Sequence, residues 1–108
     1  MRTPEACQDL NDVRIGIDTL DQQIIQALGQ RLAYVKAAAQ FKPSEASIPA
    51  PERVAAMLPL RREWATDAGL DPAFIGPLFA QIIQWNIDQQ ILHWRMTHPQ
   101  TAEGAEHE

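Results

Sequence analysis

The sequence predicts an all-α protein built from three helices, one of them very long. Apolar residues recur every three or four positions through three stretches of the chain, which is the period of one helix face. No stretch alternates apolar and polar residues in the manner of a half-buried strand. Proline-containing segments separate the three stretches, so we expect three helices and no sheet.

The composition fits one small domain, which we place at residues 1–98, with a flexible polar tail at 99–108. Of the 108 residues, 45% are hydrophobic and 21% charged, which is ordinary for a folded globular chain. A net charge of −5 argues against a general affinity for nucleic acid. The sequence has no run of about 18 apolar residues and no basic-then-apolar start, so we expect neither a membrane span nor a signal peptide. The single cysteine, Cys7, cannot form an internal disulfide, which fits a cytoplasmic protein.

The longest helix is predicted from residue 9 to about residue 42, with Lys42 in or just past its last turn. Asp9 suits the N-cap, Asp12 places an acid in the first turn, and Pro43 disfavours helical geometry at the residue before it. At about 1.5 Å per residue, such a helix is roughly 50 Å long. Its apolar stripe consists of Leu10, Val13, Ile17, Leu20, Ile24 and Leu28.

The second helix is predicted to follow a loop at residues 43–51. Pro51 suits the first helical position, and Gly69 suits the residue just past the C-terminal end. Pro59 lies inside the helical pattern, so we expect a kink there.

The third helix is predicted from about Pro72 to about Thr97, with Asp71 as its N-cap. Its apolar residues cover a wide arc, as expected of a helix packed on two sides. Two uncharged polar residues, Asn86 and Gln90, lie in the middle of that arc.

The length of the first helix predicts a partner chain. Two shorter helices cannot cover the whole stripe of a helix of roughly 50 Å and also bury their own apolar faces. A second copy whose long helix packs alongside would cover the stripe, so we expect an obligate dimer.

The second half of the long helix carries two cations on its apolar face. The stripe continues through Arg31, Val35, Ala38 and Lys42. On an ideal helix, Arg31 and Lys42 lie about 20° apart around the axis and roughly 16 Å apart along it. Unpartnered buried cations are costly, so one interpretation is that both face an anionic ligand across an apolar floor. The other is that Arg31 pairs with an acid of another helix while Lys42 complements the helix C-terminus, and the pattern leaves both open.

Three further polar residues are candidates for contacting the ligand, and each could instead have a purely structural role. Arg14 lies about 25 Å and roughly 100° from Arg31, so it is a solvated arginine unless a partner helix brings it to the same ligand. Gln90 is either a satisfied core amide or a donor aimed at a ligand oxygen. Arg53, at the start of the second helix, is by default an exposed cation.

The residue pattern excludes several kinds of catalytic site. His93 and His98 lie about 140° apart around a helix, so they do not share a face for a metal ion. Cys7 has no histidine near it in sequence, and no paired carboxylates fall on the apolar faces. Fixed cations, amides and apolar walls remain, and these suit holding a dianion in one conformation while charge moves.

The pattern of candidate residues resembles the all-helical chorismate mutase family. The matching positions are Arg14, Ile17, Asp18, Asp21, Arg31, Lys42, Glu52, Arg53 and Gln90. The resemblance covers the chain from about residue 9 to residue 94. Within that family, residues 3–5, 25–29, 34–38, 48–59 and 78–83 look like the isochorismate-pyruvate lyases of bacterial salicylate and siderophore biosynthesis.

The resemblance implies an intertwined homodimer with the chorismate mutase type II fold and two identical sites, each completed by Arg14 of the other chain. It implies that Arg14 and Arg31 bind substrate carboxylates, while Lys42 and Gln90 approach the ether oxygen of an enolpyruvyl group. Further substrate contacts are expected from Val35, Ile48, Arg53 and Ile87, with the 43–50 loop closing over the ligand. The resemblance implies no cofactor and no metal ion.

Two departures from the family pattern bear on the reaction. Chorismate mutases commonly carry polar groups where this chain has Ala50 and Val54, so acceptors for the ring hydroxyl of chorismate are missing. The resemblance therefore implies a lyase that converts isochorismate to salicylate and pyruvate by pericyclic elimination, with Lys42 and Gln90 as catalytic residues. Chorismate mutase activity, as a main or side reaction, is one alternative. A non-catalytic helical dimer, such as a regulatory or nucleic-acid-binding module, is another, and the acidic balance counts against nucleic acid.

Overall fold

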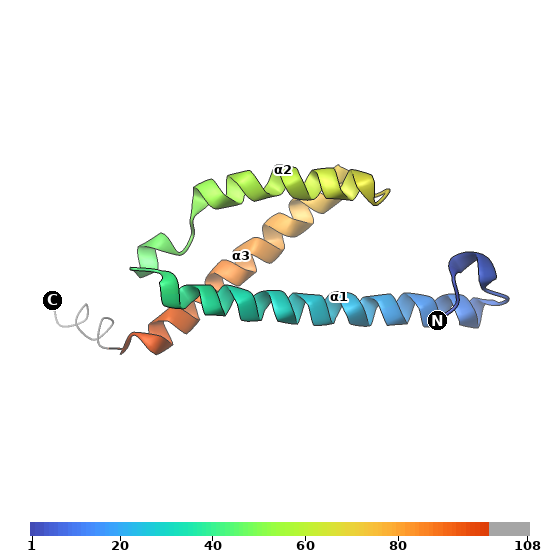
Figure 1. The fold of residues 1–108 in the computed structure, drawn as a ribbon, viewed down its shortest axis with the longest axis horizontal. Helices are drawn as coiled ribbons and strands as arrows, with labels where there is room; N and C mark the ends of the chain where they lie inside the picture. The colour runs from blue at the N-terminus through green and yellow to red at the C-terminus, as the bar shows by residue number, and fades with distance from the viewer. Residues whose placement is uncertain (100–108) are drawn as a thin grey trace. The chain divides into compact units, whose positions relative to one another are not determined.

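A computed structural model describes residues 1–99 and shows three long helices with three short 3₁₀ turns (Figure 1). The elements in chain order are η1 (Pro4–Ala6), α1 (Leu10–Ala38), η2 (Ala39–Phe41), η3 (Glu45–Ser47), α2 (Pro51–Asp67) and α3 (Pro72–Thr97). No strand occurs among residues 1–99, so the predicted all-α class is confirmed. The expected tail lies, from residue 100, outside the described residues. The chain divides into two compact units, Met1–Tyr34 and the part from Val35 onward.

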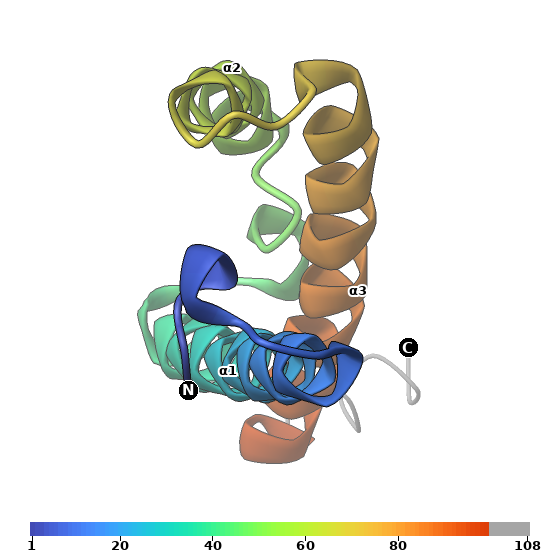
Figure 2. The same cartoon turned by 90° about the vertical axis from the view of Figure 1, so that its right-hand side faces the viewer.

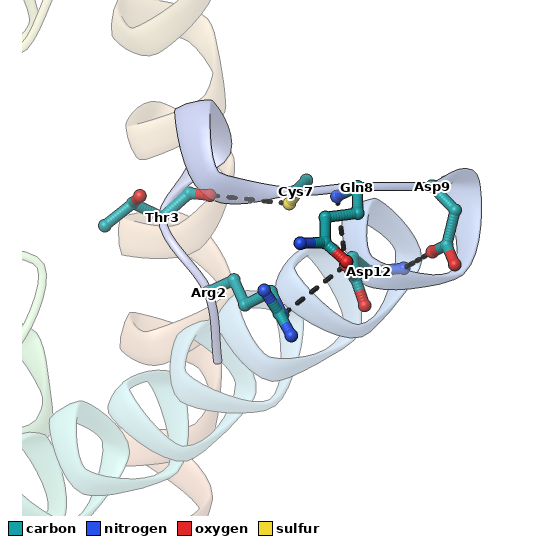
Figure 3. A network of polar contacts seen from close by, with 6 residues as sticks. All are labelled: Arg2, Thr3, Cys7, Gln8, Asp9 and Asp12. Carbon is teal, nitrogen blue, oxygen red and sulfur yellow. Dashed lines mark hydrogen bonds and ion pairs between the residues drawn. The ribbon is translucent and has the colours of Figure 1, made fainter.

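In the first unit, α1 begins with the predicted cap at Asp9 (Figure 3). The backbone N–H of Asp12 donates to Asp9 Oδ1 at 2.8 Å, which satisfies an N–H that the start of a helix leaves without a partner. The N–H of Gln8 donates to Asp12 Oδ2 at 3.0 Å, and Arg2 Nε lies 3.5 Å from the same oxygen. These contacts fix the chain where it enters the helix.

The N-terminal residues fold back beside α1 and form an apolar groove with it. Its walls include Met1, Pro4 and Cys7 from the N-terminus and Val13, Ile17 and Leu20 from α1. The stripe is otherwise open to solvent in the single chain, and Ile24, for example, is 57% exposed. No residue of α1 is buried. The helix therefore presents an apolar face that its own chain does not cover.

The end of α1 places Lys42 outside the regular helix. The regular helix stops at Ala38 and tightens into η2, and Lys42 follows in an extended conformation with φ −88° and ψ 125°. Pro43 crowds the residue before it, as predicted, but the regular helix ends several residues earlier than the sequence suggested. The projection that put Lys42 about 20° from Arg31 assumed a helix through Lys42 and does not apply.

In the second unit, α2 begins at the predicted Pro51 and ends in a Schellman motif. The N–H of Leu70 donates to Ala65 O at 2.8 Å, and the N–H of Gly69 donates to Thr66 O at 3.0 Å. Gly69 has a φ of +76°, the left-handed conformation that this motif requires at its C′ residue. The predicted role of Gly69 is confirmed.

α3 begins at the predicted Pro72, and Asp71 Oδ1 accepts the N–H of Ala73 at 2.8 Å. Near this end α3 passes close to α2, because a Cβ added at Gly76 would lie 2.7 Å from Arg62 Nε. Figure 1 shows α2 and α3 diverging from the turn that joins them, and Figure 2 shows the same two helices from another side.

The core of the second unit is small. Its buried apolar residues are Ala39, Ile48, Met57, Ala65, Ile83 and Trp94. The polar residues Asn86 and Gln90 are buried among them, as their place in the apolar arc predicted. Among the helices described, none combines the length and apolar character needed to cross a membrane.

Candidate active site

The second unit brings together five of the predicted site residues. They are Val35, Lys42, Ile48, Ile87 and Gln90. These residues come from three segments far apart in the sequence: the end of α1, the connection between α1 and α2, and α3. Two hydrogen bonds and one apolar cluster join the three segments.

Gln90 is 5% exposed, and its side-chain amide is bonded to the last turns of α1. Gln90 Nε2 donates to Val35 O at 2.6 Å. The bond fixes the orientation of the amide, because only its nitrogen can donate. It uses one of two N–H donors, which leaves the second able to reach another acceptor. The two interpretations of Gln90, a core amide and a ligand donor, are therefore compatible.

Lys42 begins a segment, residues 42–48, that is attached to the last turns of α3. Trp94 Nε1 donates to Lys42 O at 3.3 Å. At the other end of the segment, Ile48 is 2% exposed and packs in one cluster with Trp94, against which Ile87 also lies. Lys42 itself is half-buried, and its main-chain carbonyl is bonded to one member of this cluster.

Glu45 and Arg95 form an ion pair that completes this attachment. Neither residue was predicted to have a role. The Glu45 carboxylate pairs with the Arg95 guanidinium across the 42–48 segment and α3. The hydrogen bond from Arg95 is the main cause that lowers the pKa of Glu45, and the same contact raises the pKa of Arg95. Because 50 positions separate the two residues, no local spacing rule could have linked them. The sequence indicated Trp94 only as one of the apolar residues of the third helix.

Acid is expected to loosen this ion pair. Because the folded-state pKa of Glu45 is depressed, its contribution to stability is present above the ordinary value of 4.5 and is lost as pH falls through the lower folded value. Urea denaturation of the wild type and Glu45→Gln should show a small stability difference at pH 7 that is smaller at a second pH, well below 4.5. Glu63→Gln, at an exposed carboxylate of α2, is the matched control. An equal difference at both pH values would contradict a charge-dependent attachment.

The three arginines of the predicted site lie elsewhere in the chain. Arg14 is exposed near the start of α1, and Arg31 is half-buried further along the same helix. Arg53 is exposed in the first turn of α2. The convergence of Arg14 and Arg31 on one ligand with Lys42 stays a prediction.

The second unit offers polar and cationic groups next to apolar side chains. Within residues 1–99 there is no group of three or more histidine, cysteine, aspartate or glutamate side chains placed to hold a metal ion. The unit instead presents a half-buried lysine, a fixed amide donor and apolar side chains. Such groups bind an anionic molecule and stabilise negative charge that develops on an oxygen.

Comparison with known proteins identifies the class to which this helical chain belongs. It is a member of the chorismate mutase type II family, whose family model matches residues 13–91. The chain is also similar to the isochorismate pyruvate lyase of Pseudomonas aeruginosa. The two are 61% identical over 97 residues, which cover 90% of this chain and 96% of that protein. The resemblance inferred from the sequence is confirmed for the family and for the lyase subgroup.

Proposed function

We propose that this protein is an isochorismate pyruvate lyase, which converts isochorismate to salicylate and pyruvate. The observation that carries the proposal is the 61% identity, over 90% of the chain, to a protein of that name. In the reaction the ether C–O bond breaks, a ring hydrogen moves to the methylene carbon of the enolpyruvyl group, and the ring becomes aromatic. No other reactant enters the balance, so the protein needs only to bind, orient and stabilise charge.

Lys42 and Gln90 are the proposed catalytic residues. The ether oxygen becomes electron-rich as its bond breaks, and donors that are already in place stabilise that charge without reorganising. Two observations support these roles. Lys42 is half-buried and its main-chain carbonyl is bonded to the buried Trp94, and Gln90 has a second N–H beyond the one bonded to Val35.

Arg14 and Arg31 are proposed to bind the two substrate carboxylates, for which the planar guanidinium fork is well suited. Arg14 is assigned to the partner chain, because it lies about 25 Å along α1 from Arg31. The apolar walls and the cover of the site are proposed to come from Val35, Ile48, Ile87, Arg53 and the 43–50 loop. The packing of Ile48 and Ile87 in one cluster supports this assignment.

Chorismate mutase activity is proposed as a side reaction. The match to the chorismate mutase type II family model favours some ability to bind chorismate. Ala50 and Val54 stand where the resemblance leads us to expect polar groups for the ring hydroxyl of chorismate. Elimination from isochorismate is therefore the proposed main reaction.

A direct assay tests the proposed function. Purified protein given isochorismate should produce salicylate, which is followed by its fluorescence, with an equal amount of pyruvate. The same protein given chorismate should produce prephenate at a much lower rate. Absence of salicylate formation would contradict the proposal, and prephenate as the faster product would reverse the order of the two activities.

We propose that the working form is a homodimer. One apolar stripe of α1 is exposed in the single chain, and α3 carries a second exposed stripe within about 40° around its axis. The α3 stripe consists of Phe74, Leu78, Trp85, Leu92 and Met96. A second copy covers such faces economically, because both chains bring the same unsatisfied apolar surface.

Ile24→Glu tests the dimer. A carboxylate in the middle of the α1 stripe would be buried without a partner in both copies, which strongly disfavours association. We expect sedimentation to give about half the wild-type mass at micromolar concentration. Ile15→Glu is the matched control, since Ile15 is 48% exposed and lies about 180° around the helix from Ile24. Retention of the dimer by Ile24→Glu, or its loss in both variants, would contradict an interface on this stripe.

We also propose that residues 1–98 act as one domain in the cytoplasm. α1 runs without a break across the boundary between the two units, so both contribute residues to one helix. The single cysteine fits a reducing compartment.

A further inference from the structure

We infer that Trp94 is a positioning residue: its indole N–H, together with the Arg95–Glu45 ion pair, holds the 42–48 segment against α3 and thereby places Lys42 for the reaction. The inference rests on the proposed function, because Trp94 would act through the catalytic role of Lys42. The inference gives Trp94 a function, whereas the sequence indicated only that it belongs to the apolar face of α3.

Trp94 suits this role because its surroundings hold it firmly. It is 5% exposed and packs with Ala39 and Ile48. The ring of His98 stacks on the Trp94 ring, with centroids 4.1 Å apart and an interplanar angle of 11°. His98 Nδ1 also lies 2.8 Å from Trp94 O. An indole that is already immobile loses little further entropy when its N–H donates a hydrogen bond.

The hydrogen bond is made to the main chain of Lys42 and leaves its ammonium group available. The Lys42 carbonyl accepts from Trp94 Nε1, and the Lys42 N–H donates to Ala39 O at 3.1 Å. Both main-chain polar groups of this residue are therefore held. Because a lysine side chain is long and flexible, fixing the backbone from which it extends narrows the region that its ammonium group reaches.

The remainder of the segment is attached at two further points. The Glu45 carboxylate pairs with Arg95, and Ile48 is buried beside Trp94. Just beyond, Ala50 has φ 42° and ψ 61°, a left-handed conformation that costs free energy for a non-glycine residue and persists where the surroundings hold the backbone. Since the ion pair is partly exposed, we expect the indole bond to contribute more than the pair does.

Trp94→Phe tests the inference, because it keeps an aromatic ring for packing and stacking but removes the N–H donor. We expect kcat for isochorismate to fall about fivefold, as for the loss of one hydrogen bond, with KM changing less than about twofold. Hydrogen exchange of peptides that cover residues 42–48 should become faster. Trp64→Phe is the matched control on α2, where the ring lies 4.8 Å from the Arg61 guanidinium, and it should change neither quantity.

Two companion measurements separate positioning from general stability. In a Lys42→Ala background, followed by single turnover, Trp94→Phe should change the rate less than about 1.5-fold, because no ammonium group is left to place. Arg95→Ala should also speed exchange of the 42–48 segment, and Arg95→Lys should restore most of the protection.

Unchanged exchange in Trp94→Phe would overturn the inference. Faster exchange with unchanged kcat would overturn it as well, and so would an equal loss of rate with and without Lys42. If the wild-type protein forms no salicylate from isochorismate, the proposed function fails and the inference fails with it. If the wild type forms salicylate and Trp94→Phe changes neither kcat nor hydrogen exchange, the inference fails while the proposed function stands.

Discussion

Lys42→Ala is expected to lower kcat for isochorismate by about 10²–10³-fold, the loss typical of removing one donor that stabilises a developing negative charge. Binding of a dicarboxylate analogue of the substrate should weaken far less, since the carboxylates are assigned to Arg14 and Arg31. Salicylate fluorescence in steady-state kinetics gives the first quantity, and calorimetric titration with the analogue gives the second.

Lys36 provides the control for this experiment, because it is the only other lysine in the chain. It lies in the last turn of α1 and has no proposed contact with substrate. Lys36→Ala should leave kcat within about twofold of the wild type. If Lys42→Ala loses as much analogue affinity as kcat, Lys42 contributes binding only, and its proposed catalytic role is wrong.

Mixing two inactive variants should restore activity if the sites are shared between chains. Arg14→Ala and Arg31→Ala should each abolish measurable turnover, since each removes one carboxylate ligand from both sites. In a mixed dimer, one site combines the intact Arg31 of one chain with the intact Arg14 of the other. With equal amounts and free exchange of chains, half of the dimers are mixed and each has one intact site, so about a quarter of wild-type activity is expected.

The control mixture pairs Arg14→Ala with a chain that carries both substitutions, because no combination of these chains yields an intact site. Salicylate formation is measured after a brief exposure to mild urea, which lets the chains exchange, and return to buffer. Recovery only in the first mixture supports a site built from two chains. No recovery in either mixture, with exchange shown by mass spectrometry of tagged chains, would mean that Arg14 and Arg31 serve a site within one chain.

The parts of the fold that were predictable are those set by local chemistry. Asp9 and Asp71 cap helices because short side-chain oxygens reach the first free N–H groups, and Gly69 ends α2 because it tolerates a positive φ. The three helices follow from apolar periodicity alone. The change from α-helix to 3₁₀ turn after Ala38 was not predicted, because Pro43 restricts only the residue directly before it.

The sequence singled out candidate site residues but did not indicate which residues they contact. Charge and amide groups on an apolar face singled out Lys42 and Gln90, since such groups are rare where burial is expected. Their actual partners, Trp94 and Val35, lie more than 50 residues away in the chain and contribute an indole N–H and a backbone carbonyl. Neither partner has a sequence signature, because any residue supplies a carbonyl and a tryptophan in a helix usually signals core packing.

The uncovered length of α1 has a thermodynamic consequence for how this protein forms. A helix of about 44 Å with none of its residues buried by its own chain gains little from tertiary packing, and isolated helices are marginal in water. If the missing contacts come from a second copy, folding and association become one second-order event. The melting temperature then rises with chain concentration, and dilution alone increases the fraction of unfolded chains.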